Sequence, residues 1–169
     1  VQEAKKELYQ ELAFTDNMTQ LGNRMAYEYE LERLRQNPQA AGDIMVADLN
    51  NLKRINDSYG HQAGDAAIKE TAIILKECFE GIGKCYRIGG DEFCVISSIG
   101  VHDKFIKYFE DFIEKTKSQQ KNVEYPYSVA AAYGTIDSNG VDECFKIVDA
   151  KMYNNKRRSK QSRESNIQA

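Results

Sequence analysis

Apolar and polar positions along the chain form short segments that are typical of strands alternating with amphipathic helices. A nearly continuous apolar run over 44–48 follows Gly42 and predicts a strand that is buried on both faces and is therefore central in its sheet. Apolar residues then recur at helical spacing over 64–79, and Gly81 and Gly83 signal the end of this helix. The residues on its apolar side are Ile68, Thr71, Ile74, Leu75 and Cys78.

The rest of the pattern divides into further helices and strands. We predict helices over 2–14, 23–36, 105–117 and 141–156, and strands over 84–88, 92–97 and 127–135. After the first two helices the order is strand, helix, strand, strand, helix, strand. This order predicts an α+β protein with a ferredoxin-like βαββαβ core and extra N-terminal helices.

The predicted topology states which residues should meet. A right-handed crossover leaves the first two strands parallel, and the hairpin return inserts the third strand between them. The carboxyl end of the first strand, at Asp48, should therefore lie beside the turn at Gly89 and Gly90. We expect acids that are distant in sequence to converge there.

Composition limits the classes of protein that remain. The 169 residues fit one domain that needs no disulfide or metal to fold. A net charge of −3 argues against a nucleic-acid partner, although the segment 156–160 is locally basic. No apolar run is long enough for a membrane helix and no signal peptide is visible, so we expect no membrane contact by this segment. Reduced core thiols in a cytoplasmic protein are expected from the unpaired spacing of Cys78, Cys85, Cys94 and Cys144.

The most informative segment is 87–93, where two acids follow two adjacent glycines. Paired glycines between strands often form no more than a hairpin, because glycine adopts positive φ without a Cβ clash. A second acidic segment, 48–65, changes this interpretation because the topology brings both segments to one place. Together they indicate a site for a metal ion and a nucleotide phosphate.

These segments resemble the GGDEF family of bacterial diguanylate cyclases. Residues 89–93 read Gly-Gly-Asp-Glu-Phe, the signature of that family. The segment 48–65 is similar to its pattern Asp-x-x-x-x-Lys-x-x-Asn-Asp-x-x-Gly-His-x-x-Gly-Asp, the segment 16–24 to its opening motif, and 149–160 to its closing helix. The resemblance implies a nucleotidyl-cyclase-like fold and the condensation of two GTP into cyclic di-GMP with release of pyrophosphate.

The same resemblance implies a metal site for one or two Mg²⁺ or Mn²⁺ ions. Its ligands would be Asp48, Asp91, Glu92 and the main-chain carbonyl of Leu49. Carboxylate oxygens suit these cations, which bridge nucleotide phosphates. Asp91 and Glu92 would be the catalytic pair, with Glu92 binding metal or accepting the proton. Taken singly, any of these acids is as well explained as a solvated surface carboxylate.

Substrate-binding residues follow from the resemblance as well. Asn56 and Asp65 would read guanine, since a carboxylate accepts from both N1–H and the N2 amine, or they would simply cap a turn and the helix expected to begin there. The remaining expected contacts to the substrate are Asn51, Leu52, Lys53, Lys156, Lys160, Gly89 and Gly90. The first two offer main-chain N–H groups at a helix start, and the lysines offer charge. Such lysines also commonly serve only solubility and the helix dipole.

The chain departs from the family pattern at several positions. Glu80 and Gly83 replace the arginine and aspartate of an inhibitory site that many members carry, so we expect no product inhibition there. Lys160 stands where arginine is common and cannot make a planar bidentate phosphate contact. Other departures are Gln20, Asn50 and Asn51. His61 is expected to stabilise its loop, and His102 has no partner motif.

We expect a linker helix over 1–14 from an upstream sensory region, a catalytic domain over 15–160, and a frayed polar tail over 161–169. Catalysis would need a transient two-fold homodimer, because each subunit would hold one GTP. Two other interpretations stay open. One is a catalytically inactive relative that binds GTP and regulates a partner domain, and the other is a ferredoxin-like module that binds RNA on its sheet.

Overall fold

The structure, a computed structural model, describes the backbone of residues 1–167 and side chains up to residue 161. Its strands are β1 (Gly42–Leu49), β2 (Gly83–Arg87), β3 (Glu92–Ser97) and β4 (Val129–Ile136). Its helices are α1 (Gln2–Phe14), α2 (Arg24–Gln36), α3 (Leu52–Tyr59), α4 (His61–Phe79), α5 (His102–Gln120) and α6 (Val141–Ile167). The strands form one antiparallel sheet in the order β2-β3-β1-β4. The predicted fold and the insertion of the third strand between the first two are confirmed.

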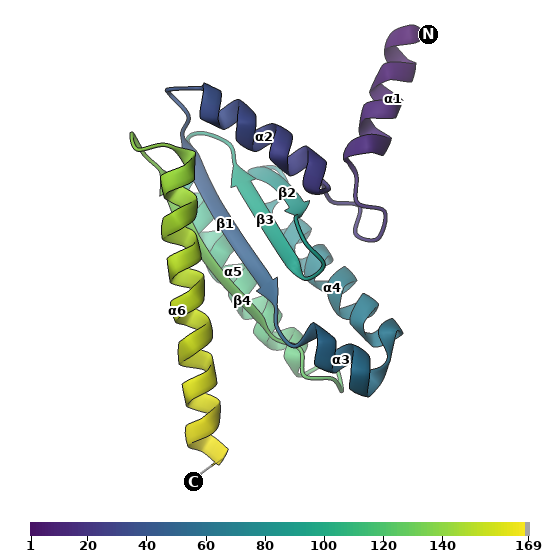
Figure 1. Ribbon diagram of the computed structural model, residues 1–169, viewed down its shortest axis with the longest axis vertical. Helices are drawn as coiled ribbons and strands as arrows, with labels where there is room; N and C mark the ends of the chain where they lie inside the picture. Colours follow the sequence, from purple (N-terminus) through teal and green to yellow (C-terminus); the bar gives the residue numbers. More distant parts are fainter. Residues whose placement is uncertain (168–169) are drawn as a thin grey trace.

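Helices cover both faces of the sheet (Figure 1). Met45 and Ala47 of β1 belong to the core formed with α4 and α5, whereas Ile44 and Val46 pack with residues of α2 and α6. All four are buried, as the continuous apolar run over 44–48 predicted. The sheet is therefore the middle layer, and β1 is fixed from both sides.

Helix α1 stands apart from this body (Figure 1). None of its residues is buried, and Leu8 and Leu12 are 55% and 65% exposed. Helix α2 begins one residue later than predicted because Asn23 is its N-cap, with the side chain accepting from the Ala26 N–H at 3.0 Å.

Several boundaries differ from the sequence prediction. The helix expected over 64–79 begins at His61, so Asp65 lies inside α4 and cannot cap its start. The separate helix α3 precedes it, and Gly60, with φ of +90°, makes the sharp connection. Helix α5 begins at His102 and ends at Gln120, earlier and later than predicted. Helix α6 begins at Val141 as predicted but continues to Ile167 instead of ending near 156; residues 168–169 lie outside the described part.

The predicted core thiols are free cysteines in the structure. Three of them, Cys78, Cys94 and Cys144, are buried, and burial raises the pKa of Cys85 to about 12. No helix in the described part of the chain is both long and apolar enough to cross a bilayer.

Candidate active site

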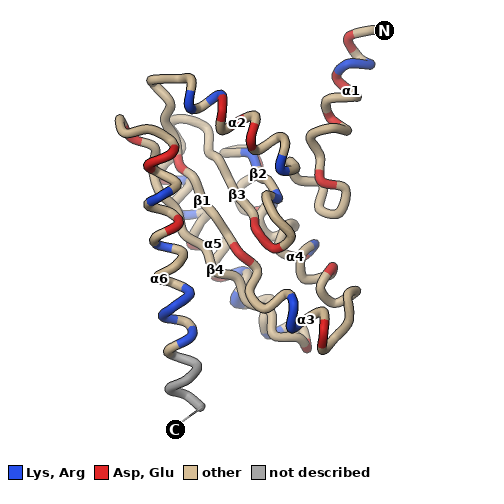
Figure 2. The backbone as a smooth tube through the Cα atoms, in the orientation of Figure 1, with Lys and Arg blue, Asp and Glu red and all other residues tan. Residues whose placement is uncertain are grey.

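The end of β1 and the start of β3 bring the predicted acids together. Asp48 is the register partner of Glu92, and the Leu49 N–H donates to the Asp91 carbonyl at 2.8 Å. In Figure 2 the acidic end of β1 lies beside the acidic turn between β2 and β3. The convergence expected from topology is confirmed.

A cavity of about 290 Å³ opens at this place. Its lining residues are Asp48, Leu49, Asn50, Asn51, Asp91, Lys156, Ser159 and Lys160. Six of the predicted site residues therefore share one cavity. The others do not line it: Leu52, Lys53, Asn56, Asp65, Gly89, Gly90 and Glu92.

Asp48 is held by the C-terminal helix. Its Oδ2 accepts from the Lys156 Nζ at 2.6 Å, and its side chain is only 15% exposed. Burial is the largest influence and raises the pKa of Asp48; Asp91 acts in the same direction, whereas the hydrogen bond and charge of Lys156 lower it. The Lys156 ammonium therefore neutralises the poorly hydrated Asp48 carboxylate.

The donor set fits a hard divalent cation that is shared with a ligand. Among the described residues no group of three acid, histidine or cysteine side chains could hold a metal alone. Asp48 and Asp91 with the Leu49 carbonyl supply few protein oxygens, which is the pattern of Mg²⁺ sites completed by water and phosphate.

The two glycines of the turn are not explained by positive φ, and only Gly89 has a close neighbour. Neither Gly89 nor Gly90 is among the residues with positive φ, so the hairpin explanation by left-handed backbone is wrong here. A Cβ on Gly89 would lie 2.7 Å from the Glu92 Oε2, because the Glu92 side chain folds back over the turn. Gly90 has open space around it. Glycine at 89 therefore leaves room for this placement of the exposed Glu92 carboxylate, which a larger residue would displace.

Two arginines that sequence reasoning left without a role fix this turn. Arg87 Nη2 donates to the Gly90 carbonyl at 2.9 Å, and its Nη1 lies 3.4 Å from Asp16 Oδ2 in the opening loop. Arg24 Nη1 donates to the Ile88 carbonyl at 2.9 Å. Arg87 and Asp16 stand within the segments that carried the family resemblance, and that proximity to a motif was the available signal.

Asn51 and Asn50 shape the backbone after β1. Asn51 adopts a left-handed conformation with φ of 61° and caps α3 without a side-chain hydrogen bond. Asn50 is anchored to Ser128 by its main-chain N–H and by its side chain, both at 2.8 Å. A left-handed residue before a helix turns successive N–H groups toward one point, which suits an anion.

Asn56 and Asp65 lie on α3 and α4, outside the cavity. The Asn56 Oδ1 occupies the place where a side chain at Gly64 would begin. The Asn56 amide of α3 therefore packs directly against the main chain of α4 at Gly64. Asp65 follows directly and is exposed. The amide thus lies against Gly64, the residue before the exposed acid, at the α3–α4 junction.

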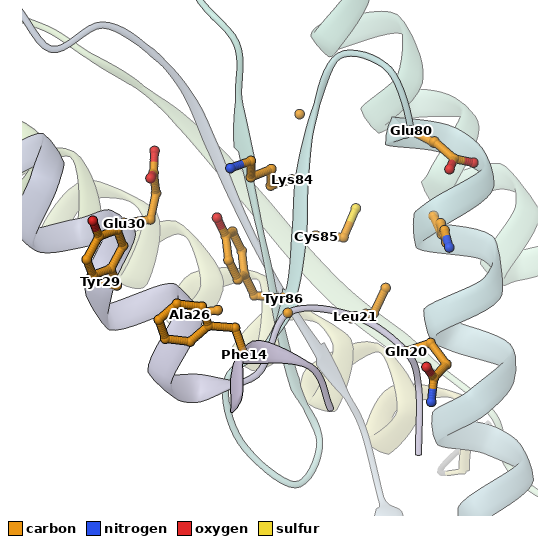
Figure 3. A pocket seen from close by; sticks show the side chains of 13 residues that line it. Phe14, Gln20, Leu21, Ala26, Tyr29, Glu30, Glu80, Lys84, Cys85 and Tyr86 are labelled. Carbon is orange, nitrogen blue, oxygen red and sulfur yellow. The ribbon is translucent and has the colours of Figure 1, made fainter. Parts of the chain in front are cut away.

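Glu80 and Gly83 form an isolated bridge at the edge of β2. They line a different cavity of about 430 Å³, in which Figure 3 shows Glu80 across from Glu30 of α2 with Lys84 between them. A Cβ on Gly83 would lie 2.7 Å from the main-chain oxygen of Ile96. The strand pairing itself therefore requires glycine at 83.

The two histidines have different surroundings. His61 is exposed at the first position of α4. His102, for which the sequence shows no partner motif, has its Nδ1 2.8 Å from Asp43 Oδ1 at the opposite end of β1. Asp43 is 2% exposed and also accepts from Thr135 Oγ1 at 2.7 Å. This pair ties α5 to the sheet, far along β1 from Asp48.

Comparison with known proteins places these features in a family. The model described as "Diguanylate cyclase, GGDEF domain" matches residues 13–162. Diguanylate cyclase DgcS of Shewanella oneidensis is 39% identical over 100 residues, covering 56% of this chain and 34% of that protein. The probable diguanylate cyclase DgcJ of Escherichia coli is 32% identical over 158 residues, covering 88% of this chain and 31% of that protein.

The chain spans about a third of the length of these curated relatives. Among solved structures, the GGDEF domain of DgcB from Caulobacter crescentus in complex with c-di-GMP superposes with a TM-score of 0.75 at 24% identity, covering 86% of this chain and 91% of that one. A structure of the coiled coil and GGDEF domain of the same protein gives a TM-score of 0.79 at 23% identity, covering 92% and 86%. The fold is thus shared, and by its match over residues 13–162 the chain belongs to the GGDEF family of diguanylate cyclase domains.

Proposed function

We propose that this chain is a catalytically active diguanylate cyclase domain, which condenses two GTP into cyclic di-GMP and releases two pyrophosphates. The observation that carries the proposal is the cavity that Asp48, at the end of β1, and Asp91, in the turn before β3, line together with Lys156 and Lys160. Carboxylates for a metal and ammonium groups for a triphosphate are the two parts that phosphoryl transfer requires.

The metal site would use Asp48, Asp91, the Leu49 carbonyl and Glu92, with Mg²⁺ or Mn²⁺. A bound ion would acidify the ribose 3′-hydroxyl and neutralise charge on the phosphates. Glu92, held against Gly89, would bind metal or accept the hydroxyl proton as it attacks the α-phosphorus of the other GTP. The turn at Gly89 and Gly90 would approach the substrate closely, since no side chain intervenes.

The phosphates would lie against the start of α3 and the cationic face of α6. Main-chain N–H groups of Asn51 and Leu52 would cradle oxygens beside the left-handed turn. Lys156, now paired with Asp48, would exchange that partner for a phosphate when metal binds. Lys53 and Lys160 would add charge at the rim.

Asn56 and Asp65 would recognise the base. A carboxylate at Asp65 accepts from N1–H and the N2 amine of guanine, whereas adenine presents an acceptor at N1 and leaves the carboxylate unpaired. Such a mismatch costs roughly 1–3 kcal/mol. The pair therefore favours GTP over ATP.

Each subunit would bind one GTP, so the reaction would take place between two copies related by a transient two-fold axis. We infer the arrangement of linker helix 1–14 and catalytic domain 15–160, with an upstream sensory region that sets how often copies meet. The exposed leucines of α1 support a helix that continues toward another segment. A cytoplasmic location and the absence of nucleic-acid or membrane partners belong to the same proposal.

A second candidate is a GTP-binding domain that regulates a partner without catalysis. The observation in its favour is the 2.6 Å contact of Lys156 with Asp48, which blocks a proposed metal ligand. The paired acids Asp91 and Glu92 argue against it, because binding without chemistry does not require them.

The test is incubation of the chain with GTP and Mg²⁺ over a range of protein concentrations, with chromatography of the products. We expect cyclic di-GMP, at a rate per molecule that rises with protein concentration, and none from the Asp91→Ala, Glu92→Ala variant. Metal-dependent GTP binding without product, even when the chain is fused to a stable dimerisation helix, would select the regulatory candidate.

Product inhibition at the β2 edge is expected to be absent. Glu80 presents negative charge where a cyclic dinucleotide would need a cation, so added cyclic di-GMP should leave the initial rate unchanged. Cyclic di-GMP that competes with GTP for the active site would also lower the rate, but a high GTP concentration would relieve that inhibition. An inhibition that persists at saturating GTP would contradict the prediction.

The aspartate of the inhibitory site cannot be restored at Gly83 without damage. Because a Cβ there meets the Ile96 main-chain oxygen, Gly83→Asp should lower the free energy of unfolding by about 1–3 kcal/mol. Urea unfolding measures this, with the exposed neighbour Glu80→Arg as the control that should unfold like the parent. Equal stability of both variants would contradict the prediction and show that the β2–β3 pairing can accommodate a side chain at position 83.

A further inference from the structure

The outer edge of β4 carries a second cavity, of about 500 Å³, between α5 and α6. Its lining residues are Phe109, Ile113, Ala131, Ala132, Tyr133, Lys151, Asn154, Asn155 and Arg158. We call it the β4-edge groove. It shares no lining residue with the candidate active site, although α6 contributes to both.

Along this edge of β4 the main-chain carbonyls are hydrogen-bonded to α6, whereas the N–H groups can still donate to a ligand. In the described part of the chain β4 pairs with β1 alone. The Asn50 N–H to Ser128 carbonyl bond sets the alternation, so the main-chain N–H and C=O groups of Ala131 and Tyr133 point away from β1. Their carbonyls are already bonded: Lys151 Nζ donates to Tyr133 O at 3.0 Å and Asn155 Nδ2 to Ala131 O at 3.2 Å. The N–H groups of Ala131 and Tyr133 are what the edge still offers.

An added β-strand would not suit this edge. Strand addition needs alternating donors and acceptors along the edge, and here side chains of α6 cover the acceptors. An anion needs donors alone. The lining residues include two cations, Lys151 and Arg158, and no acid, so the charge of the groove also selects an anion.

The far wall is aromatic. Phe109 and Tyr133 lie with ring centroids 4.8 Å apart, and the Lys151 Nζ stands 5.5 Å from the centre of the Tyr133 ring. Ala131 and Ala132 keep the groove open, since larger side chains at these strand positions would fill the space. A flat ring could lie against this wall while an attached anionic group reaches Lys151 and the two N–H groups.

The geometry points to the β4-edge groove as a binding site for a phosphate ester of a flat heterocycle, in size a nucleoside monophosphate. The phosphate would take the Lys151 ammonium, the Arg158 guanidinium and the N–H groups of Ala131 and Tyr133. The heterocycle would pack on Phe109 and Tyr133, and the amides of Asn154 and Asn155 would meet its polar edge. Because α6 also carries Lys156 and Lys160, an occupied groove would hold the helix that serves the active site.

The experiment is a titration of the full chain with AMP, followed by the backbone amide signals of Ala131 and Tyr133 in ¹H–¹⁵N spectra. AMP is the probe because the proposed guanine site should not accept adenine. We expect saturable shifts of both signals, with binding at least about tenfold weaker for inorganic phosphate and for adenosine, each of which supplies only half of the ligand. Comparable affinity for adenosine would overturn the anionic site, and comparable affinity for phosphate would overturn the role of the ring.

Variants separate the groove from other cationic surfaces. Lys151→Gln and Arg158→Gln should each weaken AMP binding at least about tenfold, while Lys146→Gln, an exposed position of the same helix, should not. Asp91→Ala should leave AMP binding unchanged, which distinguishes this site from the active site even if the chain makes no cyclic di-GMP. No shift at about 10 mM AMP, or equal loss in the Lys146 variant, would overturn the proposal.

Discussion

Replacing Asp48 with asparagine is expected to abolish cyclic di-GMP formation without unfolding the domain. Asparagine keeps the shape of the side chain but removes the charge that would hold the metal, and Lys156 loses its present partner. The rate should fall by at least about 100-fold, since even residues that only support metal ligands alter affinity or activity by about 10- to 100-fold. Product chromatography at saturating GTP and Mg²⁺ measures it.

The same substitution should not cost stability at neutral pH. Burial raises the pKa of Asp48 from 3.8, so the folded state binds this proton more tightly than the unfolded chain does. The stability that this group contributes is therefore present below pH 3.8 and is lost as the pH rises through its higher folded-state pKa. Asparagine removes that penalty, and the melting temperature at pH 7 should be equal to or above that of the parent.

Thermal unfolding at pH 7 and near pH 4, beside the activity assay, tests both parts. The difference between variant and parent should shrink toward the lower pH, because the protonated fraction of the parent carboxyl rises as the pH falls. Asp142→Asn is the matched control, because Asp142, in the first turn of α6, is exposed and pairs with Arg35 of α2, far from Asp48. An asparagine variant that melts earlier, or one that still makes the product, would contradict the assignment of Asp48.

The parts of the fold that follow from local patterns could be predicted. The run over 44–48 gave a central strand because burial on both faces leaves no polar positions, and Met45 and Ile44 do face opposite layers. The meeting of Asp48 with the glycine turn followed from handedness and strand order alone. Neither result needed knowledge of a particular side-chain contact.

Features that depend on contacts between distant residues could not be predicted. Helix α3 buries only Ile55, so apolar spacing does not give its extent, and the sequence predicts only a helix start near Asn51 and Leu52. The link between Asp43 and His102 joins positions 59 apart in the chain, and the hold of Arg87 on Gly90 depends on the opening loop through Asp16. The placement of the Glu92 carboxylate over Gly89 is likewise a side-chain contact that no local rule supplies.

Gly64→Ala is expected to weaken GTP binding strongly while leaving α4 helical. In an ordinary helix interior alanine is more favourable than glycine by about 1 kcal/mol. Here the new methyl group would take the place of the Asn56 Oδ1 and come within 3.3 Å of Leu52 Cδ1. The Asn56 side chain must turn away, and the proposed guanine site loses one of its two polar groups. Loss of such a contact corresponds to roughly 1–3 kcal/mol, or about a 10- to 100-fold weaker affinity for GTP.

A double-mutant cycle decides whether Gly64 acts through Asn56. If it does, Asn56→Ala alone should weaken GTP binding by a similar factor, and adding Gly64→Ala to it should cost little more. In that background the alanine should even stabilise the fold by up to about 1 kcal/mol, because the collision is gone. Calorimetric GTP titration and urea unfolding measure the two sides, with the exposed neighbour Ala66→Ser as control. Additive losses of affinity would instead mean that position 64 contacts the nucleotide itself, and that Asn56 is a structural cap of the α3–α4 junction.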